Sequence, residues 1–111
     1  MKEESKKYLE DIRFAITNIE SFMEGVSDFF QYEKDIKTKS AVERQLGIIG
    51  EAAKKLSDTE PEIELNHIYQ IISVRNRIIH AYDTIDDSII WAIWKNHLTG
   101  LKLEVDAILK G

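Results

Sequence analysis

Four polar side chains near the end of one apolar segment have the types and the spacing for phosphodiester chemistry. Arg75 and Asn76 are followed by an imidazole at His80 and a phenol at Tyr82. His80 can move a proton near neutral pH, because an unperturbed imidazole has a pKa of about 6.5. Arg75 can hold a phosphate through two parallel hydrogen bonds and offset the charge that builds on its oxygens in the transition state. Asn76 can orient the imidazole or a substrate oxygen.

Arg75 is the residue that decides how this segment is interpreted. At about 100° per residue, it falls about 20° from Ile68, in the centre of a face that Ile71, Ile72, Ile78 and Ile79 also form. A guanidinium is almost never buried without a partner. Arg75 therefore meets a carboxylate, lines a subunit interface or waits for an anionic ligand, and the third possibility makes it a site.

Spacing alone favours the structural alternative. One arginine and one histidine on a helix are more often a buried ion pair and a histidine at the edge of the core. An arginine with five N–H donors can simply tie helices together. The available carboxylates, Glu43 and Glu51, are both expected to project away from the apolar stripe of their own helix.

Length and composition indicate one small domain. The chain has 111 residues, of which 43% are hydrophobic, and it has no cysteine, so residues 1–111 are predicted to form a single helical domain without disulfides. No signal peptide is visible in the N-terminal residues, and no apolar run approaches the roughly 18 residues of a membrane span, so we expect a cytoplasmic protein. The formal charge of −5 argues against a broad basic surface for long nucleic acid. A small cationic cleft, supplied by Arg75, Arg77 and nearby lysines, is still possible.

The elements that must position these residues are helices. Four segments with helical periodicity are predicted: residues 4–26, a second from Thr38 or Ser40 to about 57, a third from Ile63 or Leu65 to Tyr82, and a fourth from Asp86 or Asp87 almost to the C-terminus. A short extra helical turn is expected over residues 29–33. No strand pattern appears. The predicted fold is all-α, an antiparallel four-helix bundle.

Small residues mark the second predicted helix. Gly47, Gly50, Ala52 and Ala53 would let a neighbouring backbone approach closely, so this helix is expected to be central or to cross a partner. His67 and His97 are expected to be structural, and Trp91 and Trp94 to pack in the core or at a dimer interface. Three histidines without a spaced carboxylate predict no metal site, and nothing indicates a cofactor.

The run from Arg75 and Asn76 to His80, Ala81 and Tyr82 resembles the R-x4-H-x-Y motif of HepT-like proteins, a branch of the HEPN ribonuclease superfamily. Residues 48–54 are similar to the second-helix signature of that family, and residues 61–63 to the entry of its motif helix. The similarity spans most of the chain. The sequence differs from the pattern of many family members at two places beside the motif, Glu64–Leu65 and Asp83–Thr84. These differences are expected to affect substrate choice and the recognition of an antitoxin more than catalysis.

The resemblance implies a metal-independent endoribonuclease that acts as the toxin of a toxin–antitoxin pair. Arg75 and His80 match the catalytic positions of enzymes that cut RNA through attack of the ribose 2′-hydroxyl, with Asn76 as a polar position of the motif. Tyr82 matches the tyrosine that a nucleotidyltransferase antitoxin adenylylates. Family members form homodimers whose motif helices face each other. The alternative is a non-catalytic helical partner of a nucleotidyltransferase; a histidine phosphotransfer bundle is disfavoured, because His80 lacks the following basic and glycine residues.

Overall fold

The computed structural model describes residues 1–80 and 85–111, without the side chains of residues 79 and 80, and all regular structure in these residues is helical. This confirms the predicted all-α class. The helices are α1 (Glu3–Phe22), α2 (Phe29–Lys34), α3 (Ile36–Thr59), α4 (Tyr69–His80), α5 (Asp87–Asn96) and α6 (Leu98–Lys110). None of them is long and apolar enough to cross a lipid bilayer.

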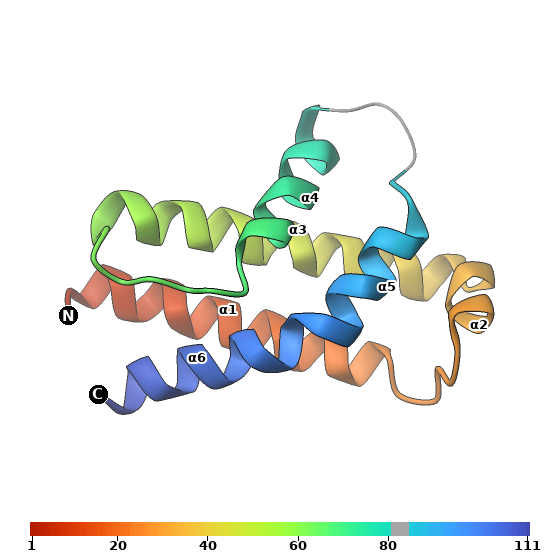
Figure 1. The fold of residues 1–111 in the computed structure, drawn as a ribbon, viewed down its shortest axis with the longest axis horizontal. Helices are drawn as coiled ribbons and strands as arrows, with labels where there is room; N and C mark the ends of the chain where they lie inside the picture. The colour runs from red at the N-terminus through yellow and green to blue at the C-terminus, as the bar shows by residue number, and fades with distance from the viewer. Residues whose placement is uncertain (81–84) are drawn as a thin grey trace.

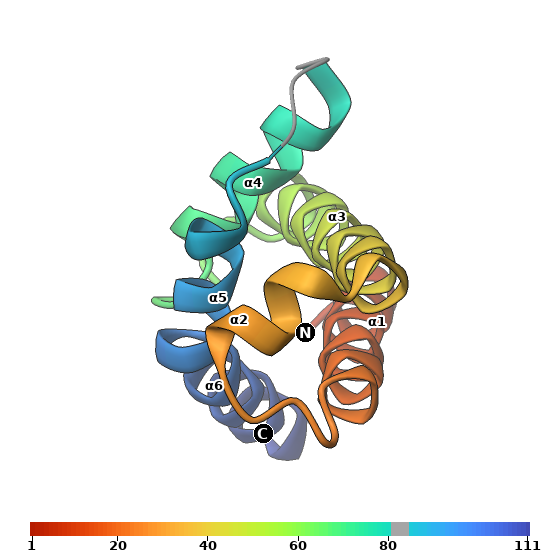
Figure 2. The ribbon, with the colours of Figure 1, turned by 90° about the vertical axis from the view of Figure 1, so that its right-hand side faces the viewer.

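The helices form a bundle in which α1 and α3 are the central antiparallel pair (Figure 1). α6 lies along α1 and runs back toward the N-terminus. α4 crosses α3 at a steep angle, and its C-terminal end rises away from the other helices (Figure 1). α2, the predicted short helical turn, lies across one end of the bundle (Figure 2). The site helix α4 is therefore attached mainly through α3.

One hydrophobic core joins the helices, and it follows most of the predicted stripes. For α3 the helical periodicity predicts a stripe of Val42, Gln45, Leu46, Ile49, Ala53 and Leu56, and its five apolar members are buried. For α1 the periodicity predicts a stripe of Tyr8, Ile12, Ala15, Ile19, Phe22 and Val26. The buried face is shifted from it, because Leu9 and Ile16 are also buried while Phe22 is 37% exposed. The aromatic residues before α3 differ in burial. Tyr32 is buried against Trp91, whereas Phe30 is exposed.

Helix boundaries differ from the sequence prediction where a carboxylate satisfies backbone N–H groups. α3 begins at Ile36, earlier than the predicted Thr38 or Ser40, because Asp35 accepts a hydrogen bond of 3.0 Å from the Thr38 N–H. α1 ends at Phe22, before the predicted residue 26, and Gly25 follows with a φ of 82°.

α4 and the last predicted helix differ more. α4 begins at Tyr69, because the preceding segment takes a non-helical path in which Glu104 of α6 accepts hydrogen bonds from the N–H groups of Asn66 and His67. The last helix is divided at His97, whose φ of −125° and ψ of −33° end α5 before α6 begins. α5 begins at Asp87, one of the two predicted starts, and Asp86 caps it by accepting a hydrogen bond from the Ser88 N–H.

Candidate functional site

Arg75 is held on α4 by Glu51 of α3. The Arg75 Nε donates to Oε2 of Glu51 at 3.0 Å, and Nη2 donates to the same oxygen. The arginine side chain is 11% exposed and the glutamate side chain 42% exposed, so the ion pair lies at the edge of the core. The arginine on the apolar face therefore meets a carboxylate, the first of the possibilities that the sequence left open.

Glu51 lies outside the buried stripe of α3, as the sequence predicts. α4 nevertheless crosses α3 along the side of that stripe (Figure 1), and Arg75 reaches Glu51 there. Gly50 permits this crossing: a Cβ atom there would lie 2.5 Å from the Arg75 Cβ and 3.5 Å from the carbonyl oxygen of Ile71. The small residues of α3 thus do allow a close neighbour, and it is α4 of the same chain.

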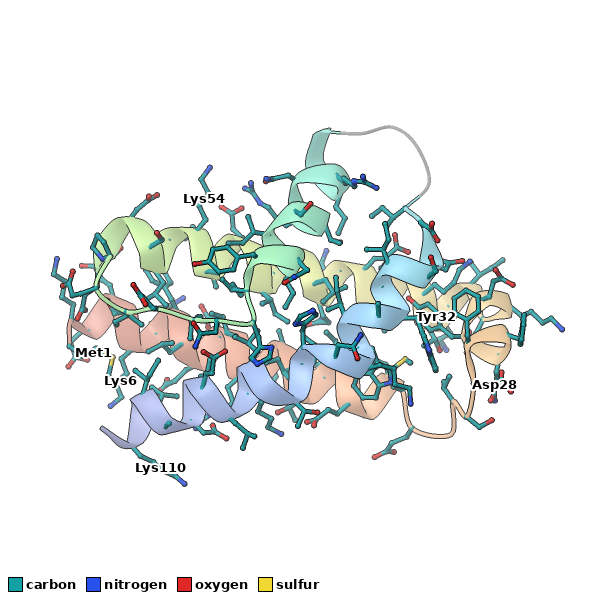
Figure 3. All side chains as sticks on the ribbon, in the orientation of Figure 1. Met1, Lys6, Asp28, Tyr32, Lys54 and Lys110 are labelled. Atoms are coloured by element: carbon teal, nitrogen blue, oxygen red, sulfur yellow. The ribbon has the colours of Figure 1, made fainter. Side chains whose placement is uncertain are left out.

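The charge of Glu51 is stabilised by its surroundings. The hydrogen bonds from Arg75 hold the pKa of the Glu51 carboxyl below its ordinary value of 4.5, and the positive charges of Arg75, Lys55 and Lys54 act in the same direction. Lys54 projects outward from α3 (Figure 3). A carboxylate that remains ionised is a fixed anchor for the guanidinium, so the orientation of Arg75 is set before any ligand arrives.

Asn76 completes the network on the solvent side. Its Oδ1 accepts a hydrogen bond of 3.0 Å from Nη1 of Arg75, which leaves its amide nitrogen as a donor. Of the five N–H donors of Arg75, three are used within the described residues, and one on each of Nη1 and Nη2 remains. Two N–H donors of one guanidinium can match two oxygens of a phosphate.

The structure brings two of the four predicted site residues together. Arg75 and Asn76 contact each other, and His80 is the last residue of α4, one turn further along the same helix. The position of the His80 side chain and all of Tyr82 lie outside the described residues. Glu51 is the additional residue of the site, and the signal that pointed to it was the glycine beside it at position 50, which marks where α4 crosses.

The other histidines lie apart from Arg75 and contact each other. The Nδ1 atoms of His67 and His97 are 3.2 Å apart, which joins the segment before α4 to the junction of α5 and α6. A Cβ atom on Gly100 would lie 2.6 Å from Nε2 of His67, so the ring occupies space that only a glycine leaves. Trp91 and Trp94 are partly buried against the core.

Comparison with known proteins identifies the family. The family described as Ribonuclease HepT-like matches residues 12–108. A protein of Thermococcus cleftensis named "Probable ribonuclease HepT" is 36% identical over 99% of this chain and 100% of its own length. A protein of Methanocaldococcus jannaschii named "Putative RNase" is 33% identical over 98% of this chain and 90% of its own. No solved structure matches the chain. The family match and the two full-length relatives agree: the chain belongs to the HepT-like ribonuclease family.

Proposed function

We propose that the protein is a metal-independent endoribonuclease that acts in the cytoplasm as the toxin of a toxin–antitoxin pair. The observation that carries the proposal is the state of Arg75, whose guanidinium is fixed by Glu51 and Asn76 and keeps one N–H donor on each of its two terminal nitrogens within the described residues. Membership of the HepT-like ribonuclease family supports RNA as the substrate. The −5 charge of the chain fits a short RNA segment held at one cleft rather than a long track.

In the proposed reaction, His80 removes the proton of a ribose 2′-hydroxyl, and the 2′-oxygen attacks the adjacent phosphorus. The bond from phosphorus to the 5′-oxygen of the next nucleotide breaks, and that oxygen leaves with a proton supplied by an imidazolium. The products are a 2′,3′-cyclic phosphate and a 5′-hydroxyl end. Arg75 holds the non-bridging oxygens as their charge increases, and the Asn76 amide orients the imidazole or a substrate oxygen.

The proposed enzyme is a homodimer with the α4 helices of the two copies facing each other. This arrangement would place two Arg75 and two His80 side chains around one groove. One imidazole could then act as the base while the other, protonated, acts as the acid. Two guanidinium groups in one groove would also supply the local positive charge that the whole chain lacks.

We further propose that a nucleotidyltransferase antitoxin adenylylates Tyr82. The tyrosine follows His80 by two residues, so an adenylyl group attached there would carry its phosphate to the neighbourhood of Arg75. The phosphate would occupy the donors that the RNA needs, and inhibition would follow from occupation of the site. The mass of the protein, made with and without an active nucleotidyltransferase encoded next to it, should differ by one adenylyl group, and Tyr82→Phe should remove the difference. An unchanged mass in the presence of the active partner would contradict this part of the proposal.

The cleavage proposal is tested with purified protein, labelled RNA and EDTA. The wild type should produce 2′,3′-cyclic phosphate ends with EDTA present, His80→Ala should abolish cleavage, and Arg75→Lys should slow it strongly, because an ammonium cannot form the paired hydrogen bonds of a guanidinium. Arg13→Lys is the matched control: Arg13 forms a surface ion pair with Asp106 at 3.4 Å, and its variant should cleave like the wild type. Full activity in His80→Ala would contradict the mechanism.

One observation favours the alternative, a non-catalytic partner of a nucleotidyltransferase: Arg75 is already paired with Glu51, so no ligand is needed to stabilise it. The alternative expects a tight complex with the nucleotidyltransferase and no RNA cleavage by the wild type or by any variant. The same cleavage assay therefore separates the two functions.

A further inference from the structure

A cavity of about 530 Å³ adjoins the Arg75 site on the face formed by α1 and α3. Its apolar lining includes Tyr8 of α1, Ile48 and Ala52 of α3 and Ile78 of α4. Glu51, the partner of Arg75, is also part of the lining, so the cavity is continuous with the candidate site. Its volume lies within the range of about 300–1,000 Å³ that small-molecule sites in proteins occupy.

The α3 side of the cavity includes a stripe of four residues spaced by four, three and four: Arg44, Ile48, Glu51 and Lys55. This spacing places them on one helix face, with the two cations about 16 Å apart along the axis at about 1.5 Å per residue. Arg44 and Lys55 are exposed, and neither forms an ion pair within the residues that the structure describes.

The carboxylates around the cavity are largely compensated. Glu51 is paired with Arg75, and Asp11 is paired with Lys7 at 3.0 Å. The remaining carboxyl, Glu43, is half-buried, and burial raises its pKa. The cavity therefore has an apolar lining between two positively charged side chains, Arg44 and Lys55, which form no ion pair within the described residues.

We infer that this cavity binds the bases of an unpaired RNA strand next to the phosphate held at Arg75, with Arg44 and Lys55 contacting the phosphates on either side. The inference rests on the proposed ribonuclease function and names its substrate class as single-stranded RNA. A duplex conceals the faces of its bases, whereas an unpaired strand can insert a base against an apolar or aromatic surface and lay its backbone along cations. Ile48, which is 37% exposed, and the half-buried Tyr8 ring supply that surface.

Binding is tested separately from cleavage with a short, unstructured 2′-O-methyl RNA, which lacks the attacking hydroxyl. In fluorescence anisotropy, the double variant Arg44→Ala, Lys55→Ala should bind about tenfold more weakly than the wild type, and its salt dependence should fall by about 1.4 in log–log slope, since each single-strand phosphate contact contributes about 0.7. Ile48→Asp should weaken binding as well, because it places a charge where a base would lie. The same RNA presented as a duplex should bind more weakly than the single strand.

The matched control is Lys34→Ala, Lys110→Ala, which removes the same charge from exposed lysines that do not line the cavity. It should change the affinity by less than about twofold. Equal losses in both double variants, or equal affinity for single strand and duplex, would overturn the inference. So would an unchanged RNA affinity in Arg44→Ala, Lys55→Ala combined with a changed molecular mass in light scattering, which would assign this face to contact between protein copies.

The outcomes distinguish this inference from the proposed function. If the wild type cleaves RNA but the cavity variants bind the 2′-O-methyl strand normally, the inference fails and the ribonuclease stands. If the wild type binds the strand with the expected variant pattern but cleaves no RNA, the single-strand site stands and the ribonuclease fails.

Discussion

Gly50 and Arg75 lie so close that a single methyl group could not be added between them: a Cβ atom on Gly50 would stand 2.5 Å from the Cβ and 2.8 Å from the Cγ of Arg75. The crossing of α3 and α4 is therefore set at this point. This close contact also sets how far the Arg75 guanidinium extends over α3, and therefore which hydrogen bonds it forms with Glu51.

Gly50→Ala should destabilise the fold and weaken the site together. The Cβ of Arg75 is fixed to the backbone, so α4 must move to admit the new methyl group, and we expect the free energy of unfolding to fall by about 1–3 kcal/mol. Gly47→Ala is the control within the same helix, because its Cβ would meet only Ile78 Cδ1 at 4.0 Å. That variant should gain up to about 1 kcal/mol from helix propensity. Urea unfolding measures both, and equal changes would contradict the close crossing.

Glu51→Gln should remove a pH-dependent part of the stability. The pKa of Glu51 is lowered in the folded protein by the hydrogen bonds from Arg75, so its contribution is present above the ordinary value of 4.5 and is lost as the pH falls through the folded pKa. The difference in unfolding free energy between wild type and variant should therefore shrink as the pH is lowered below 4.5. Repeating the comparison in an Arg75→Met background should reduce the pH dependence to the smaller part that Lys55 and Lys54 cause, and an undiminished pH dependence there would exclude Arg75 as the main cause.

Gly100→Ala should be harmful only while His67 is present. The new Cβ would lie 2.6 Å from Nε2 of a ring that is also held by its contact with His97, so we expect a loss of about 1 kcal/mol or more. In a His67→Ala background the space is free, and the same change should be neutral or stabilising through helix propensity. Four urea titrations form this double-mutant cycle, and an additive result would argue against the ring as the obstacle.

Tyr32→Phe should stabilise the protein. The hydroxyl group of Tyr32 is buried and has no hydrogen-bond partner within the described residues, and burial, Glu43 and Asp87 together raise its pKa. Removing an unsatisfied buried hydroxyl should add about 1 kcal/mol to the free energy of unfolding. Tyr69→Phe, at a side chain that is 70% exposed, should leave the midpoint of thermal unfolding almost unchanged. A lower midpoint for Tyr32→Phe would indicate that its hydroxyl is bonded after all.

The sequence predicted the helices well where a long apolar stripe repeats, as in α3, because burial of that stripe dominates its stability. It predicted boundaries less well, because they depend on caps such as Asp35 for α3 and on contacts with distant residues such as Glu104 for the segment before α4. No local sequence pattern indicates that Glu104, in the last helix, accepts hydrogen bonds from the N–H groups of Asn66 and His67. Likewise, the division of that helix at His97 accompanies its contact with His67, which is distant in sequence.

The sequence predicted which residues belong to the candidate site better than it predicted how they contact one another. Arg75 and Asn76 were identified from residue type and spacing, and the structure brings them together. Glu51 was named as an available carboxylate, but its place outside the apolar stripe did not identify it as the partner of Arg75. A helical projection treats each helix by itself, whereas the partner of a side chain depends on where a second helix crosses. Gly50 indicated that another helix could cross α3 at this point. Only the structure shows that Arg75 of α4 is the residue that packs against it.

The attachment of α4 has a consequence for how the site opens. The helix packs mainly on α3 and only lightly on α5 (Figure 1, Figure 2). Its outer face, with Gln70, Ser73 and Asn76, is exposed. Local opening of a protein begins where few buried contacts oppose it. The backbone amides of α4 should therefore exchange with deuterium at a lower free energy than those of α1 and α3, so Arg75 can leave Glu51 and return while the central pair stays folded.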